Sequence, residues 1–181
     1  MSKDNLSWIT RRKIPKKIAD IIETESYKVP WYFFKDCALL LDEVDQKGYD
    51  RNPYFSHTLS KGIRQSDFYR NFPLEFITDY AIMSGKEMLR SHITFHFPIL
   101  EKFGKHHNPH VDNEKPHKVI LYYINDADGD TFFFDSDGKV IHRETPERGK
   151  MVIFDGYERY HASSSPSKNI RMTLNINYEL T

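Results

Sequence analysis

The sharpest chemical signal in the sequence is the pair His110 and Asp112, which only Val111 separates. Side chains two residues apart on a β-strand project to the same face, so an imidazole and a carboxylate at this spacing can bind one metal ion. The pair alone is weak evidence, because the chain contains 9 histidines and His142-Arg143-Glu144 offers the same geometry. A third ligand is needed to choose between the two.

His161 is the candidate for that third ligand. It follows a predicted strand that ends at Phe154 and a turn at Asp155-Gly156, and Arg171 lies ten residues beyond it. Two neutral imidazoles and one carboxylate on one face leave coordination positions open for small ligands, which is the ligand set of non-haem Fe(II) oxygenases. The chain therefore offers His, Asp, His and a distal arginine in that order.

Around these residues the sequence resembles the Fe(II)/2-oxoglutarate-dependent oxygenases, and within them the prolyl 4-hydroxylase-like branch in the short form found in bacteria and their viruses. The resemblance extends from Tyr27 to the C-terminus. It rests on separate motifs along this stretch, which are PHVD at 109–112, LYYIN at 121–125, GDT at 129–131, VIFDG at 152–156, His161 and RMTLNINY at 171–178, with weaker matches in VPWYFF at 29–34 and FSHTL at 55–59.

The resemblance implies roles for seven side chains. His110, Asp112 and His161 look like the three Fe(II) ligands of this family. Arg171 stands where the family places the residue that binds the distal carboxylate of 2-oxoglutarate, and a planar guanidinium suits that bidentate contact. The other three would each add a hydrogen bond to this cosubstrate, and they are Tyr123, Thr131 and Thr173.

For the reaction, the resemblance implies Fe(II), 2-oxoglutarate and O2, with ascorbate as a reductant. It also implies hydroxylation of a prolyl residue in a peptide or protein, with release of succinate and CO2. Two alternatives remain open. One is a 2-oxoglutarate oxygenase that acts on a free amino acid or another small metabolite, and the other is a non-catalytic jelly-roll binding module whose triad survives as a metal site.

The chain also departs from the family pattern. Many relatives have a tyrosine on the strand before the His-x-Asp motif, where this chain has Phe95 and Phe97, so His96 is the candidate to replace its hydrogen bond. Gly129-Asp130-Thr131 lacks the doubled glycine usual in hydroxylases of structural proteins. The second departure weakens any transfer of substrate identity.

The second half of the chain must position these residues, and it alternates short apolar runs with turn residues. Because no long helix separates the runs, a parallel sheet would lack its crossovers. The pattern predicts a mainly β fold with N-terminal helices, a double-stranded β-helix of the jelly-roll, cupin-like type. The expected strands are 89–97, 118–125, 131–134, 139–142, 150–154 and 170–178.

The last of these strands has one polar and one apolar face. Its polar residues are Arg171, Thr173, Asn175 and Asn177, and they alternate with apolar ones. In a plain sandwich the polar face would meet water, whereas in a jelly roll with a ligand cavity it points inward and helices cover the apolar face. The spacing between His161 and Arg171 favours the ligand-facing orientation.

The first half leans towards helix and has the length to cover a sheet. Helices are expected over 14–25, 38–46 and 72–83, and the aromatic segment 27–34 reads as a strand that Pro30 places at an edge or bend. The basic segment 11–17 is interpreted as a solvated arm, with an acidic partner as the alternative. Since 181 residues suit one domain, we expect a single domain over 1–181, with a helix-leaning cover (1–88) and a catalytic β core (89–181).

Other histidines and two loops near the predicted site are not assigned as metal ligands. His106, His107 and His117 are expected to be solvated loop residues rather than ligands, and the sequence does not decide whether they contribute to the site. His57 and His96 are expected to pack or to form hydrogen bonds. The loops 52–62 and 101–108 are expected to form the surface that recognises the substrate, without an assignment to single residues.

The composition excludes several classes of protein. Equal numbers of basic and acidic side chains, 26 each, argue against nucleic acid or a membrane surface as partner. A single cysteine cannot form an internal disulfide or a multi-cysteine metal site, so a reducing compartment is expected. No apolar run approaches the ~20 residues of a spanning helix. We therefore expect a soluble, cytoplasmic protein, and the sequence leaves its oligomeric state open.

Overall fold

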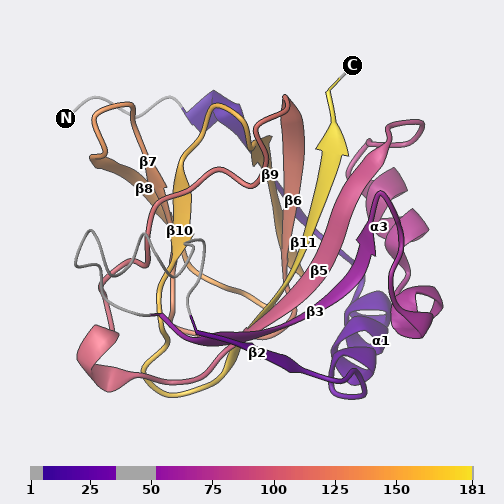
Figure 1. The fold of residues 1–181 in the computed structure, drawn as a ribbon, viewed down its shortest axis with the longest axis horizontal. Helices are drawn as coiled ribbons and strands as arrows, with labels where there is room; N and C mark the ends of the chain where they lie inside the picture. The colour runs from indigo at the N-terminus through magenta and orange to yellow at the C-terminus, as the bar shows by residue number, and fades with distance from the viewer. Residues whose placement is uncertain (1–5, 36–51, 181) are drawn as a thin grey trace.

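The computed structural model describes residues 6–35 and 52–180, in which eleven strands form two antiparallel sheets (Figure 1). The larger sheet has the strand order β1-β9-β6-β11-β5-β3-β2, with β4 paired to β3. The smaller sheet has the order β10-β7-β8. The strands are β1 (Ile9–Lys13), β2 (Tyr32–Phe34), β3 (Tyr54–Lys61), β4 (Ile63–Arg64), β5 (Met88–His96), β6 (His117–Tyr123), β7 (Thr131–Phe134), β8 (Val140–Glu144), β9 (Lys150–Asp155), β10 (His161–Ser163) and β11 (Arg171–Glu179).

In the described part of the chain, two α-helices cover one face of the larger sheet, and the smaller sheet lies on the other side (Figure 1). They are α1 (Lys16–Ser26) and α3 (Leu74–Tyr80), and three short 3-10 helices are η1 (Leu6–Trp8), η2 (Asp67–Asn71) and η3 (Leu100–Lys102). Ile22 of α1 and Ile77 of α3 are fully buried in one core with Leu174 and Ile176 of β11. The apolar face of β11 therefore packs under the helices, and its polar face points to the space between the sheets.

This architecture confirms the predicted jelly-roll fold, and each of the six strands expected in the second half is present to within two residues. Of the expected helices, the first and third are present as α1 and α3, although α3 ends at Tyr80. The helix expected over 38–46 lies outside the described residues. The aromatic segment contributes the short edge strand β2, as Pro30 suggested.

Two expectations for the first half are wrong. The basic segment is not a solvated arm, because Ile9–Lys13 forms β1 against β9 and α1 follows it. Burial of Ile9 and Ile14 anchors this segment while Arg11 reaches Glu144. Residues 54–61 form strand β3 rather than a loop. Its inward-facing positions include the polar Ser56, whose hydroxyl donates to the carbonyl of Ile93. Because polar residues occupy inward positions, the segment lacks the alternation of apolar and polar residues that predicts a strand.

No helix in the described segments is long and apolar enough to span a bilayer.

Glu144 at the end of β8 gives the fold a testable pH dependence. Its carboxylate is 7% exposed and contacts Arg11, His142 and Lys150 at 2.8–2.9 Å. Burial alone would raise its pKa, but these hydrogen bonds prevail and lower the pKa from 4.5 to about 2. Because the folded pKa lies below the unfolded one, this stabilisation is complete above pH 4.5 and is lost as the pH falls towards about 2.

The variant Glu144→Gln should therefore flatten the acid limb of the stability curve. Between pH 5 and pH 3, the wild-type free energy of unfolding should fall by more than that of the variant, by an amount on the order of 2 kcal/mol. Urea unfolding at a series of pH values measures both. Parallel curves for the two proteins would show that Glu144 is not held in its charged form by the fold.

Candidate metal centre

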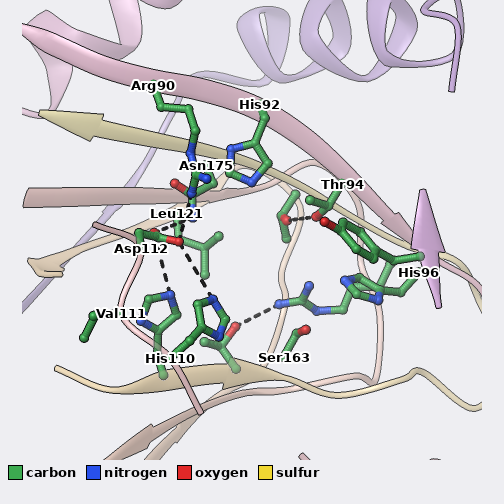
Figure 2. Close-up of a pocket in the computed structure, with 15 residues that line it drawn as sticks. Arg90, His92, Thr94, His96, His110, Val111, Asp112, Leu121, Ser163 and Asn175 are labelled. Atoms are coloured by element: carbon green, nitrogen blue, oxygen red, sulfur yellow. Dashed lines mark hydrogen bonds and ion pairs between the residues drawn. The ribbon is translucent and has the colours of Figure 1, made fainter. Parts of the chain in front are cut away.

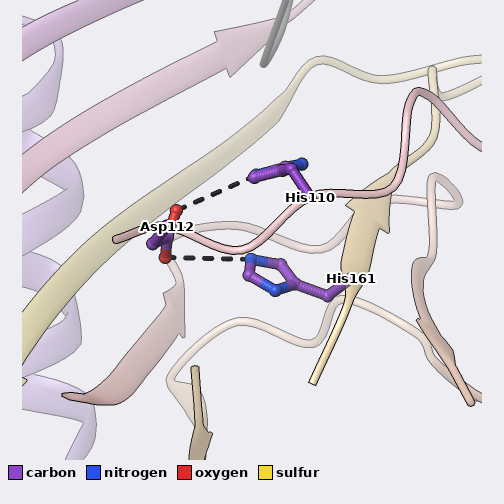
Figure 3. A group of neighbouring side chains, drawn as sticks. All are labelled: His110, Asp112 and His161. Atoms are coloured by element: carbon purple, nitrogen blue, oxygen red, sulfur yellow. Dashed lines mark ion pairs between the residues drawn. The ribbon is translucent and has the colours of Figure 1, made fainter. Parts of the chain in front are cut away.

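Three side chains from two distant segments meet at one point between the sheets. An isolated bridge joins His110 to His161, with backbone hydrogen bonds of 3.0 Å in both directions. Nε2 of His110 lies 3.8 Å from Oδ1 of Asp112, and Nε2 of His161 lies 3.8 Å from Oδ2 of the same carboxylate (Figure 3). Donor atoms of the three residues all lie within 4.8 Å of one another. One ion with bonds of ~2.0–2.2 Å to each could sit among them.

Both imidazoles are oriented by backbone carbonyls. Nδ1 of His110 is 3.1 Å from the oxygen of Asn108, and Nδ1 of His161 is 3.2 Å from the oxygen of Arg159. An Nδ1–H that donates to a carbonyl leaves Nε2 as the lone-pair nitrogen, which is how histidine ligands are usually held. Burial lowers the pKa of His161 to about 4, so its ring is neutral at physiological pH and available to a cation.

Asp112 is held from the opposite side by two residues that sequence reasoning did not assign. Nη2 of Arg90 donates to Oδ1 at 3.0 Å, and Nδ2 of Asn175 donates to Oδ2 at 2.9 Å. Burial alone would raise the pKa of Asp112, but the neighbouring His161, His110 and Arg90 outweigh it and hold the pKa well below its usual range. The carboxylate is therefore ionised and fixed in orientation, as a metal ligand must be.

The cavity that His110 and Asp112 line (Figure 2) has a volume of about 240 Å³, and the predicted cosubstrate arginine lines it as well. Arg171 is 2% exposed, and its Nε and Nη2 donate to the carbonyl of Gly129 at 2.7 Å and to Oγ1 of Thr131 at 2.9 Å. Oγ1 of Thr173 lies 2.7 Å from Oγ1 of Thr94. A buried guanidinium beside hydroxyl groups is suited to binding a carboxylate.

Tyr123 is placed differently from the other six predicted residues. Its phenol donates to Oγ1 of Thr131 at 2.9 Å, and the residue does not line the cavity. The tyrosine in the cavity is Tyr54 of β3, whose ring stacks on His96 at 5.7 Å between centroids. In this structure Tyr123 therefore supports Thr131, while Tyr54 and His96 stand at the cavity wall.

The remaining histidines do not join the metal centre. His107 and His117 are buried, so the expectation of solvated rings is wrong for these two, whereas His106 is exposed as expected. His107 lies between the hydroxyls of Ser163 and Ser165, at 2.9 and 3.1 Å. None of the three lines the cavity. His142 and Glu144, the alternative histidine-x-acid pair, bind each other, and Glu144 also pairs with Lys150.

Gly129 provides a test of how Arg171 is positioned. A Cβ at this glycine would lie 2.6 Å from the oxygen of Ser164, 2.9 Å from the nitrogen of Pro166 and 3.2 Å from Cδ of Arg171. Since the first two are backbone atoms, the variant Gly129→Ala should be destabilised by ~1–3 kcal/mol. Thermal unfolding should show a Tm lower by ~2–4 °C for each kcal/mol, together with weaker binding of a carboxylate ligand by Arg171.

The matched control is Gly138→Ala. Gly138 has a positive φ of 77°, and a Cβ there would meet nothing within 4 Å. This control should lose stability through backbone strain without a change in ligand affinity. A Gly129→Ala protein with wild-type stability and affinity would show that the contact with Arg171 is not needed.

Comparison with known proteins finds similarity in structure only. No family model matches the sequence, and no curated protein matches it. Among solved structures, a prolyl-4-hydroxylase from Pseudomonas putida has 15% identity and a TM-score of 0.62, with 96% of this chain and 92% of that one covered. A 2OG-Fe(II) oxygenase family oxidoreductase from Burkholderia pseudomallei has 12% identity and a TM-score of 0.68, with coverage of 95% and 85%.

A third similar structure is the non-heme alpha ketoglutarate dependent epimerase SnoN from nogalamycin biosynthesis, with 11% identity, a TM-score of 0.64, and coverage of 94% and 77%. The resemblance seen in the sequence is thus confirmed at the level of the fold. The presence of a hydroxylase and an epimerase among these structures shows that the fold alone does not specify the reaction.

Proposed function

We propose that this chain is an Fe(II)- and 2-oxoglutarate-dependent oxygenase. The observation that carries the proposal is the convergence of His110, Asp112 and His161 in one cavity with the buried Arg171. Two neutral imidazoles and one carboxylate suit Fe(II) and leave positions open for further ligands. The orientation of each donor by a carbonyl, an amide or a guanidinium supports this assignment.

When bound, iron with 2-oxoglutarate and O2 supplies the hydroxylation of a C–H bond, coupled to decarboxylation of the cosubstrate to succinate and CO2. The residues of the chain itself bind and orient the ion and the cosubstrate. His110, Asp112 and His161 hold the ion, and Arg171 with Thr131 holds the distal carboxylate of the cosubstrate. Burial of Arg171 keeps water from competing for that carboxylate. The charge-assisted hydrogen bond between the guanidinium and the carboxylate is therefore stronger than it would be in water.

For the prime substrate, our first candidate is a prolyl residue in a peptide or protein. The sequence motifs and the structural similarity to a prolyl-4-hydroxylase support it. A second candidate, a free amino acid or another small metabolite, is favoured by a different observation. The cavity contains a second cation, Arg90, beside the metal centre.

The proposal is tested by turnover of 2-oxoglutarate without any prime substrate. The protein is loaded with Fe(II) without oxygen, then mixed with 2-oxoglutarate, O2 and ascorbate, and succinate is followed by NMR. We expect slow formation of succinate that requires added iron. Iron binding without any succinate would contradict the proposal and favour a non-catalytic binding module.

A further inference from the structure

The inner faces of β5 and β11 form a ladder of four polar cross-strand pairs. In register, the pairs are His96 with Arg171, Thr94 with Thr173, His92 with Asn175, and Arg90 with Asn177. Six residues separate the first pair from the last, which corresponds to ~20 Å along the strands. The ladder therefore has an arginine at each end, and the polar alternation on β5 is the sequence signal that would have revealed the second one.

The two ends of the ladder differ in their surroundings. Arg171 is 2% exposed, whereas the side chain of Arg90 is 33% exposed. Asp112 docks against the Arg90 end, where Arg90 and Asn175 bind its two oxygens. Figure 2 shows Arg90, His92 and Asn175 gathered near Asp112, with Thr94 and His96 on the other side of the cavity. The metal centre thus separates a closed cosubstrate end from a more open end.

The open end contains buried polar atoms that lack a partner among the described residues. They are Nδ1 of His92, Oδ1 of Asn175, and both side-chain amide atoms of Asn177. Leaving such a group unsatisfied costs ~1–3 kcal/mol each. Asn175 is 7% exposed and lines the cavity beside Arg90, although its Oδ1 is itself buried.

Charge adds a second, independent argument. Apart from histidines, the described residues that line the cavity and carry a full charge at neutral pH are Arg90, Asp112 and Arg171. The charges of a divalent ion and Arg171 are matched by the two carboxylates of 2-oxoglutarate and that of Asp112. With Arg90, which would share Asp112 with the ion, this group of charges would have one positive charge in excess. A substrate carboxylate would supply the missing counter-charge.

We propose that Arg90, His92 and Asn175 form the prime-substrate subsite, and that Arg90 binds the carboxylate of a free amino acid there. His92 and Asn175 line the cavity beside Arg90 and would border the rest of the substrate. This inference rests on the proposed oxygenase function. It selects the small-molecule candidate, because a residue inside a peptide has no free carboxylate on its backbone.

The experiment measures how far the L-amino acids, proline included, stimulate 2-oxoglutarate turnover by the iron enzyme, each beside its own carboxamide. A proline-rich peptide with an amidated C-terminus and the same peptide with a free C-terminus are the two peptide arms. We expect at least one free amino acid to stimulate turnover at a concentration at least ~10-fold below that of its amide. Thermal shifts of the Ni(II)- and 2-oxoglutarate-loaded protein give the same comparison without turnover.

The variant Arg90→Gln should abolish this preference for acid over amide, and Arg90→Lys should keep part of it. A residue that only positions Asp112 would change metal affinity and basal turnover in Arg90→Gln but leave the acid-to-amide ratio unchanged, and that result would overturn the inference. Stimulation by the amidated peptide alone, by the free C-terminal peptide alone, or by no amino acid would overturn it as well. Absence of basal succinate in the wild type would instead refute the oxygenase function.

Discussion

Replacing Asp112 with alanine is expected to abolish iron-dependent formation of succinate, with a loss of at least ~100-fold. Substitution of residues that merely orient metal ligands commonly costs 10–100-fold in metal affinity or activity, so loss of a ligand should cost more. Asp112 is also the one carboxylate in the described cavity lining, and its charge stabilises the ion directly. Succinate formation by NMR and metal content after gel filtration measure the two effects separately.

The control for this variant is His142→Gln, in the other histidine-x-acid pair of the chain. His142 binds Glu144 at 2.9 Å and does not line the cavity, so its substitution should leave basal turnover of 2-oxoglutarate unchanged. An Asp112→Ala protein that retained wild-type turnover would remove this residue from the metal centre. Equal losses of 2-oxoglutarate turnover in Asp112→Ala and His142→Gln would show that a place in the cavity does not distinguish the two histidine-x-acid pairs.

Substitution of Arg171 by alanine should weaken 2-oxoglutarate binding by a factor between ~30 and several thousand. The variant removes the charge-assisted partner of a carboxylate in a buried pocket, which costs ~2–5 kcal/mol, or tenfold for each ~1.4 kcal/mol. His110, Asp112 and His161, the proposed ligands, remain in this variant, so iron affinity should change little. Titration of the Ni(II)-loaded protein with 2-oxoglutarate gives the affinity, and steady-state kinetics give KM.

Arg143→Ala is the matched control for the loss of an arginine. Arg143 lies on β8, pairs with Asp130 at 2.8 Å and is half exposed, so it should not affect cosubstrate affinity. Wild-type affinity for 2-oxoglutarate in Arg171→Ala would show that the cosubstrate binds elsewhere, even though Arg171 lies in the cavity.

Much of the fold could be predicted because local patterns and long-range packing agree. The alternation on β11 places Arg171 and Thr173 opposite Met172 and Leu174, and the structure buries the apolar pair under α1 and α3 as the jelly-roll interpretation requires. The short strand β7, TFFF, was also recognisable, because turn residues flank it on both sides.

Other parts could not be predicted from local sequence. Strand β10 has three residues and depends on its pairing with β7, and β1 depends on its pairing with β9. The polar stretch around His107 predicts a solvated ring, yet Ser163 and Ser165, more than fifty residues away, enclose it. Such contacts between distant segments leave no local signal.

The site shows the same division. His110 and Asp112 share a strand-like spacing that can be read directly, and His161 is indicated by its place after a predicted strand and turn, ten residues before Arg171. Arg90 and Asn175 bind Asp112 from two strands that lie on either side of it in the sequence. Their roles emerge only once β5 and β11 are paired in register.

The most direct test of the central claim is anomalous diffraction from crystals grown with Mn(II) and 2-oxoglutarate in the absence of iron. We expect one strong peak at ~2.0–2.3 Å from Nε2 of His110, Nε2 of His161 and one oxygen of Asp112. Electron density for 2-oxoglutarate should join this ion to the guanidinium of Arg171. A fully loaded crystal with the ion bound elsewhere, or with 2-oxoglutarate away from Arg171, would contradict the account.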